Sequence, residues 1–118
     1  MGVTYKLVNR TKKETILYSH IPASKDRELA GNPAAAAVTT WYMLQNRGDE
    51  IAFVADFQND WPFSEGSREE LQAYAEVTDT VVESLIDARI LEDKGIAWAD
   101  EDDPGNLYLR DLRNVWME

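Results

Sequence analysis

The run of residues 32–48, NPAAAAVTTWYMLQNRG, constrains the fold more than any other part of this sequence. Asn32 is typical of a helix N-cap, Pro33 suits the first helical position and Gly48 favours a stop. Between them stand four consecutive alanines, the residue with the highest helix propensity. The run therefore predicts a helix over 33–46. Apolar residues at helical spacing predict that one face of it is buried, with the members Ala34, Ala37, Val38, Trp41 and Leu44.

The residues before this helix predict a β-hairpin and a short helix. Residues 3–9 and 15–21 roughly alternate between apolar and polar side chains, and a polar segment separates them. Pro22 is expected to end the second strand, because proline lacks the backbone donor of a strand interior. Ser24 as a cap and Gly31 as a stop then predict a helix of about two turns.

The middle of the chain predicts one strand and two helices. Residues 50–55 are almost wholly apolar, which is typical of a strand buried on both faces. Ser67 and Glu70 have the spacing of a capping box and predict a short helix. Another helix is expected to begin at Thr78 or Asp79, to carry an apolar stripe and to end at Gly95.

The last segment predicts a second hairpin. Trp98 lies on its first strand, Leu107 and Leu109 lie on its second, and DEDDPGN connects them as a turn. The element order ββ-α-α-β-α-α-ββ predicts one α+β domain over residues 1–118, with helices on one face of a mainly antiparallel sheet and a C-terminal β-hairpin. The expected core consists of Ala37, Val38, Trp41, Leu44, Ile51, Phe53, Val81, Leu85 and Ile86.

Charge is distributed unevenly along the chain. Residues 1–48 hold seven basic and three acidic side chains, a net charge of +4, whereas residues 49–118 hold five and nineteen, a net charge of −14. The sum is −10. This asymmetry predicts a dedicated acidic surface, and it opposes binding to nucleic acid, because phosphate contacts need positive charge.

The acid-rich turn, defined as residues 100–103 with the sequence DEDD, has three interpretations: a calcium loop, a solvated turn or a surface that faces a partner. A calcium loop that began at Asp100 would have Pro104 at its fifth position, which supplies no side-chain oxygen, and Asp111 where glutamate is usual. The flanks also predict strands rather than helices. The sequence therefore predicts no metal and no other cofactor, and it leaves the solvated turn and the partner surface open.

Residues for catalysis are few. The chain has no cysteine and only one histidine, His20, and it contains neither a Gly-x-Ser-x-Gly elbow nor a glycine-rich phosphate loop. We therefore expect a protein that is not an enzyme. The sequence also contains no apolar run of the length that a membrane span needs and no leader-like start, so we expect no membrane contact and a cytoplasmic location.

These features favour an acidic protein-binding module that neutralises or inhibits a basic protein target, as immunity proteins and inhibitors that mimic nucleic acid do. The candidate interface consists of Asp56, Asp60, Trp61, Asp100, Glu101, Asp102 and Asp103. Trp61 suits a buried position as well as an interface. The alternative is a non-catalytic regulatory or assembly subunit whose acidity only serves solubility, and a small enzyme ranks third. We expect a monomer or a weak homodimer.

Overall fold

The computed structural model describes residues 3–57 and 59–116, and its strands form two sheets. The strands are β1 (Tyr5–Asn9), β2 (Glu14–Ile16), β3 (Ile51–Ala55), β4 (Ala75–Glu76), β5 (Leu91–Ala99) and β6 (Tyr108–Asn114). The larger sheet has the order β3-β1-β2-β4, and only its β2–β4 pair is parallel. β5 and β6 form a separate antiparallel hairpin. Pairing among the described strands is thus mainly antiparallel, as the sequence predicts.

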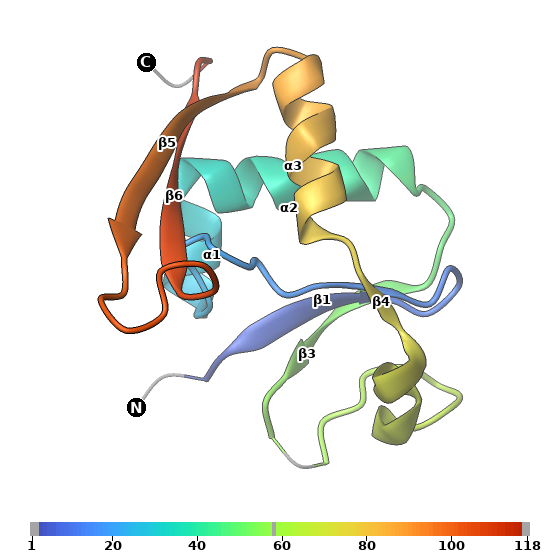
Figure 1. The fold of residues 1–118 in the computed structure, drawn as a ribbon. Coiled ribbons are helices and arrows are strands. Elements are labelled where there is room, and N and C mark those ends of the chain that lie inside the picture. Colours follow the sequence, from blue (N-terminus) through green and yellow to red (C-terminus); the bar gives the residue numbers. More distant parts are fainter. Residues whose placement is uncertain (1–2, 58, 117–118) are drawn as a thin grey trace.

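The helices lie together on one side of the larger sheet (Figure 1). They are α1 (Asp26–Gly31), α2 (Pro33–Gln45) and α3 (Thr78–Asp87). A short 3₁₀ helix, η1, spans Arg68–Ala73 and lies apart from them in Figure 1. The C-terminal hairpin stands beside the helices, where β6 contacts α2 and β5 contacts α3 (Figure 1). The predicted α+β class, with its C-terminal hairpin, is confirmed.

The hydrophobic core fills the space between the larger sheet, the helices and the hairpin. Its most deeply buried side chains include Leu7, Ile16, Tyr18, Val38, Val82, Leu85 and Leu91. Of the core predicted from the sequence, Val38, Val81 and Leu85 are buried. Half-buried side chains that pack against the core are Ala37, Trp41, Ile51 and Ile86. The prediction is wrong for Leu44, which is 56% exposed, and for Phe53, which is 38% exposed.

The start of α2 was predicted correctly, but its buried face was not. The Asn32 side-chain oxygen accepts hydrogen bonds from the backbone N–H groups of Ala34 and Ala35, both at 3.0 Å. The helix contains no charged residue, so apolar side chains occur on nearly all sides of it. Helical spacing alone therefore does not distinguish the buried face, and Leu44 lies on the exposed one.

Replacing Asn32 by alanine is expected to lower the free energy of unfolding by about 1 kcal/mol, because two N–H groups at the start of α2 lose their acceptor. Asn32→Asp keeps an acceptor oxygen and is the matched control, with a much smaller loss expected. Equilibrium unfolding in urea measures both variants. An equal loss for the two would contradict the capping role of this side chain.

Residues 50–55 form an edge strand rather than the strand buried on both faces that the sequence predicted. β3 pairs with β1 alone, because it ends the sheet order, and one of its faces lies beside an open hollow. Only Val54 and Ala55 of this strand are buried. An apolar run therefore does not by itself imply burial on both faces.

The predicted helix from Thr78 to Gly95 ends much earlier, at Asp87. Arg89 has a φ of 62°, a left-handed conformation that stops a helix, and the chain then enters β5. The start of β5 pairs with the end of β6, which is distant in sequence, so a tertiary contact overrides the local helical signal. Gly95 lies within β5 at a φ of 102°, beside an irregularity in the strand pairing.

Three other boundaries differ from the sequence predictions. The second strand of the N-terminal hairpin ends at Ile16, because Tyr18 and His20 take positive φ angles that a strand does not accommodate. α1 has Lys25 rather than Ser24 at its N-cap position. The helix predicted after Ser67 is the 3₁₀ helix η1, in which the Ser67 side chain makes no capping hydrogen bond.

Candidate protein interface

The C-terminal hairpin has an inner face that packs on the rest of the molecule. Alternate residues of β6 point to this side, because side chains of a strand alternate between its faces. The Tyr108 ring stacks on the His20 ring at 3.7 Å between centroids, and Leu112 packs against the core. His20 Nδ1 also donates a hydrogen bond of 2.9 Å to the Tyr108 carbonyl.

Arg110 ties this inner face to its surroundings. Its guanidinium lies 2.8 Å from a carboxylate oxygen of Asp93, and the carboxylates of Glu83 and Asp79 on α3 lie at 3.7 and 3.8 Å. Its backbone N–H donates to the His20 carbonyl at 2.9 Å. The Arg110 side chain is only 13% exposed, and its hydrogen-bonded ion pair with Asp93 joins β6 to β5. The longer pairs with the exposed carboxylates on α3 contribute less.

The outer face of the hairpin is uncovered. Leu107 and Leu109 point to this side, and Trp98 on β5 pairs directly with Leu109 across the strands. Trp98 and Leu107 are each 54% exposed. Every residue of β5 from Glu92 to Ala99 is exposed, so most of this strand stays accessible to a partner. A two-stranded sheet with large apolar side chains in solvent is typical of a binding surface.

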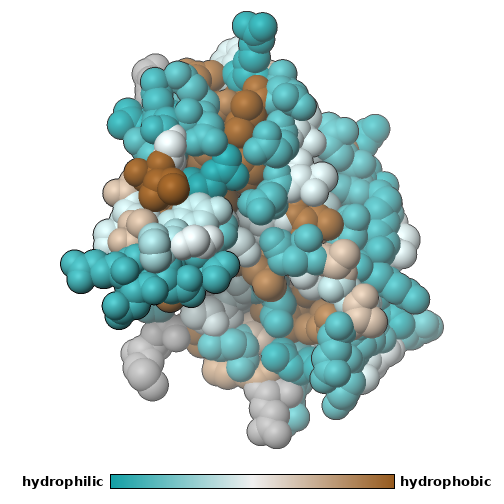
Figure 2. Space-filling model, in the orientation of Figure 1, coloured by the Kyte–Doolittle hydropathy of each residue, from teal (hydrophilic) through white to brown (hydrophobic). Residues whose placement is uncertain are grey.

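The acid-rich turn joins these two strands, and part of it has a structural role. The Asp100 carboxylate accepts hydrogen bonds of 3.2 Å from the backbone N–H groups of both Asp102 and Asp103. The Asp103 carbonyl accepts a bond from the Leu107 N–H at 2.9 Å. Glu101 and Asp102 are exposed at the tip. In Figure 2 the tip is a hydrophilic projection at the left of the view, with a pale band of intermediate hydropathy directly above it and a small hydrophobic cluster above that band.

The other three candidate residues lie in the loop between β3 and η1, where their side chains hold the loop together. The Asp56 carboxylate accepts a bond from the Thr4 hydroxyl at 2.8 Å, and the Asp60 carboxylate accepts one from the Ala55 N–H at 2.7 Å. Trp61 donates to a backbone carbonyl at 2.8 Å and packs on the neighbouring ring of Phe63.

This loop and the acid-rich turn lie apart in Figure 1, with the start of β1 between them. The structure therefore brings Asp100, Glu101, Asp102 and Asp103 together with Trp98, and it brings Asp56, Asp60 and Trp61 together at a separate place.

Sequence reasoning missed Trp98 and Leu107 as candidate interface residues. Their sequence signal is an apolar–polar alternation on the two flanks of an acid-rich turn. That pattern is the same whether the apolar face packs on a core or remains in solvent. The choice depends on which face of the hairpin meets α2 and α3, and the sequence does not state it.

Acid is expected to loosen the hairpin. The Gly95 N–H and then the Arg110 guanidinium, each 2.8 Å away, hold the pKa of Asp93 below its usual value of 3.8. Because the folded-state pKa is lowered, the stabilisation is present above pH 3.8 and is lost as the pH falls through the folded-state pKa.

Amide NMR signals of β5 measure this loosening, with Asp93→Asn as the comparison because it keeps the size of the side chain but does not titrate. We expect the wild-type signals of β5 to shift below pH 3.8 and those of the variant to shift much less. The same shifts in both proteins would exclude Asp93 as the cause.

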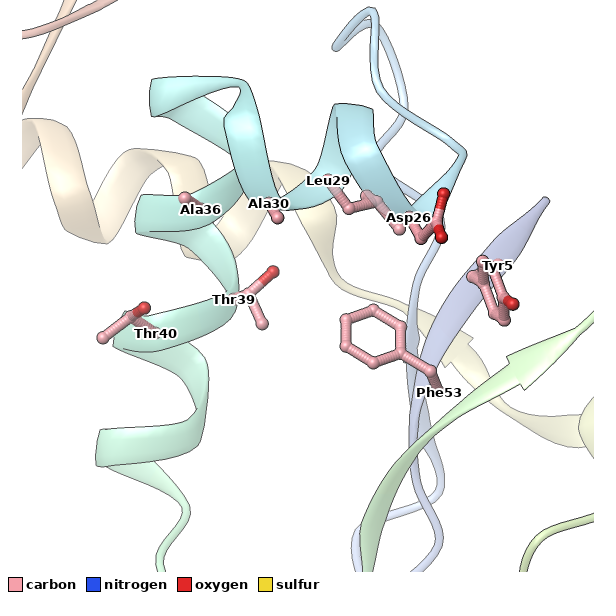
Figure 3. A pocket seen from close by; sticks show the side chains of 8 residues that line it. All are labelled: Tyr5, Asp26, Leu29, Ala30, Ala36, Thr39, Thr40 and Phe53. Atoms are coloured by element: carbon pink, nitrogen blue, oxygen red, sulfur yellow. The ribbon is translucent and has the colours of Figure 1, made fainter. Parts of the chain in front are cut away.

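Two apolar hollows border helix α2. One has a volume of about 360 Å³ and lies between α1, α2, β1 and β3 (Figure 3). The second, of about 650 Å³, lies between α2, α3 and the end of β6, and exposed Leu44 and Trp116 line it. Both hollows include Ala30, Ala36 and Thr40, so they form one continuous surface across α2.

Other kinds of site have little support within residues 3–57 and 59–116. No group of three or more histidine and acidic side chains is arranged there to hold a metal ion. No helix in this part of the chain combines the length and the apolar character that a membrane crossing requires.

Comparison of the chain with protein-family models, with curated proteins and with solved structures finds no match. We therefore infer the function from the geometry of the hairpin and of the hollows.

Proposed function

We propose that this protein is an acidic protein-binding module that neutralises or inhibits a basic protein target, and that the C-terminal hairpin is its docking element. The observation that carries the proposal is the exposed outer face around Trp98, directly beside the acid-rich turn. Protein interfaces commonly combine an apolar centre, often with tryptophan, and a charged rim. The hairpin has both components on one small surface.

Charge determines the kind of partner. Residues 91–107 contain six acidic side chains and one basic side chain, so their net charge is +1 − 6 = −5. A concentrated negative field attracts a basic surface from a distance and raises the rate of association. The same field repels nucleic acid and anionic membranes, so the proposal includes neither as a partner. A cytoplasmic location and the absence of catalysis belong to this proposal as expectations.

The anchor of the hairpin supports its use as a rigid docking element. The Arg110 guanidinium joins β6 to Asp93 on β5, and the Arg110 N–H binds the His20 carbonyl, so the hairpin is attached to the rest of the fold before a partner arrives. Less conformational entropy is then lost on binding. The roles of Asp56, Asp60 and Trp61 in an interface stay a prediction.

Affinity capture from cells of the source organism tests the proposal. Immobilised wild-type protein is expected to retain a basic protein, and a variant with Trp98→Ser and Leu107→Ser is expected to lose it. Leu44→Ser is the matched control, because Leu44 is an equally exposed apolar residue on α2. Capture of the same protein by the wild type and the hairpin variant, with loss only in the α2 variant, would refute the hairpin as the docking element.

A second candidate function is that of an assembly subunit, and the continuous apolar surface across α2 favours it. This surface has exposed Leu44 and Trp116 at one end, and a second copy of the chain would cover it. Sedimentation equilibrium tests this candidate: a dimer that dissociates on Leu44→Glu supports it. A monomer at all concentrations would exclude self-association and would leave the hairpin proposal unaffected.

A further inference from the structure

The hollow between the larger sheet and the first two helices contains an arrangement that the proposed function does not use. Tyr5 on β1 and Phe53 on β3 have their ring centroids 6.3 Å apart, with the ring planes at 80°. The carboxylate of Asp26, at the start of α1, lines the same hollow. Figure 3 shows Asp26, Leu29 and Tyr5 beside the ring of Phe53, which points from the sheet toward α2.

The pairing of the strands fixes the two rings on one face of the sheet. Tyr5 pairs with Ala55, and Phe53 pairs with Leu7, so Tyr5 and Phe53 are diagonal neighbours on adjacent strands. Because β3 is the edge strand, Phe53 is 38% exposed and stays accessible from solvent. The two aromatic walls thus come from two paired strands rather than from a loop.

Aromatic faces carry partial negative charge and attract cations, and two rings at a steep angle can contact one cation from two sides. Asp26 adds a full negative charge, and its Oδ1 atom accepts a hydrogen bond from the neighbouring Arg27 N–H at 2.8 Å. The remaining lining is mainly apolar, with Leu29, Ala30 and Ala36. Such a lining disfavours a strongly hydrated ammonium but accepts methyl groups.

We propose that this hollow binds a quaternary or methylated ammonium group, with the cation against Tyr5 and Phe53 and with Asp26 as its counter-charge. Its volume of about 360 Å³ lies within the range of small-ligand pockets. The inference does not depend on the hairpin proposal, because the residues concerned lie on α1, α2, β1 and β3.

Titration of the intact protein with choline, followed by amide NMR signals, tests this proposal. The comparison ligand is 3,3-dimethylbutan-1-ol, which has the same shape but a neutral carbon in place of the nitrogen. We expect choline to shift the signals of Tyr5, Asp26 and Phe53, and we expect the neutral alcohol to bind at least about fivefold more weakly. Equal affinity for the two ligands would overturn the proposal, because it would leave an apolar hollow without preference for a cation.

Variants of the protein locate the site and measure separately the contributions of the aromatic wall and of the counter-charge to choline binding. Phe53→Leu keeps an apolar side chain but removes one aromatic wall, and Asp26→Asn removes the counter-charge, so each is expected to weaken choline binding by about tenfold. Phe57→Leu is the matched control, since Phe57 is exposed outside the hollow. Unchanged affinity in both pocket variants would overturn the proposal, as would the absence of any choline shift at these residues in the wild type.

A short peptide that carries trimethyllysine identifies the source of the ammonium group. If the peptide binds more tightly than choline and the Phe53→Leu variant weakens it, the group belongs to a modified protein. If choline binds more tightly, the group belongs to a free small molecule. Both results support recognition of a methylated cation, whereas binding of the peptide that survives Phe53→Leu contradicts it.

Discussion

Replacing Leu85 by alanine is expected to lower the free energy of unfolding by about 2–5 kcal/mol. Leu85 lies on α3, is only 1% exposed and belongs to the cluster that joins the helices to the hairpin. Removal of its side chain loses buried apolar contacts and leaves a cavity that the neighbours fill only in part. Because domains of this size have a total stability of about 5–15 kcal/mol, the loss is large enough to measure by urea unfolding.

The matched control is Leu44→Ala on α2, which removes the same atoms from a side chain that is 56% exposed. Its expected effect on the free energy of unfolding is within about 0.5 kcal/mol. Helical spacing in the sequence predicts that both leucines are buried, whereas the structure buries only Leu85. The two variants therefore test the structure against the sequence pattern. A larger loss for Leu44→Ala than for Leu85→Ala would show that the buried face of α2 is assigned wrongly.

Neutralising the tip of the hairpin with Glu101→Gln and Asp102→Asn is expected to slow association with the basic partner by about fivefold or more at low salt. Both residues are exposed, and Asp100, whose carboxylate holds the turn, is left unchanged. The effect should shrink as salt rises, because mobile ions screen exposed charges. Thermal stability should stay the same or rise slightly, since like charges no longer repel each other. Stopped-flow or surface-based kinetics at two salt concentrations measures the rates.

A control variant with Glu65→Gln and Glu69→Gln removes the same charge from exposed residues near η1. Association rates are expected to fall less in this variant than in the tip variant, because steering depends on where the charge lies and not only on the net charge. Equal rates for the wild type and the tip variant at low salt would mean that the acid-rich turn only connects two strands. Equal slowing in both variants would assign the effect to net charge.

Features encoded by neighbouring residues were predictable from the sequence. Asn32 and Pro33 mark the start of α2 because a capping side chain binds backbone groups two and three residues further on. The turn at residues 100–106 was predictable for the same reason: Asp100 and Asp103 bind the backbone of their own turn. The α+β class follows from the order of such locally encoded elements.

Features that depend on packing appeared only in the folded chain. Residues 91–93 are a strand because they meet residues 112–114, and Leu44 is exposed because other side chains of α2 face the core. The exposure of Trp98 to solvent also depends on packing. So does the position of Tyr5, Asp26 and Phe53 around one hollow. Apolar spacing states that a side chain can be buried, but burial requires a second surface from elsewhere in the chain. Tertiary contacts decide whether such a second surface is present. At both candidate binding sites, no other described part of the chain covers the apolar side chains completely.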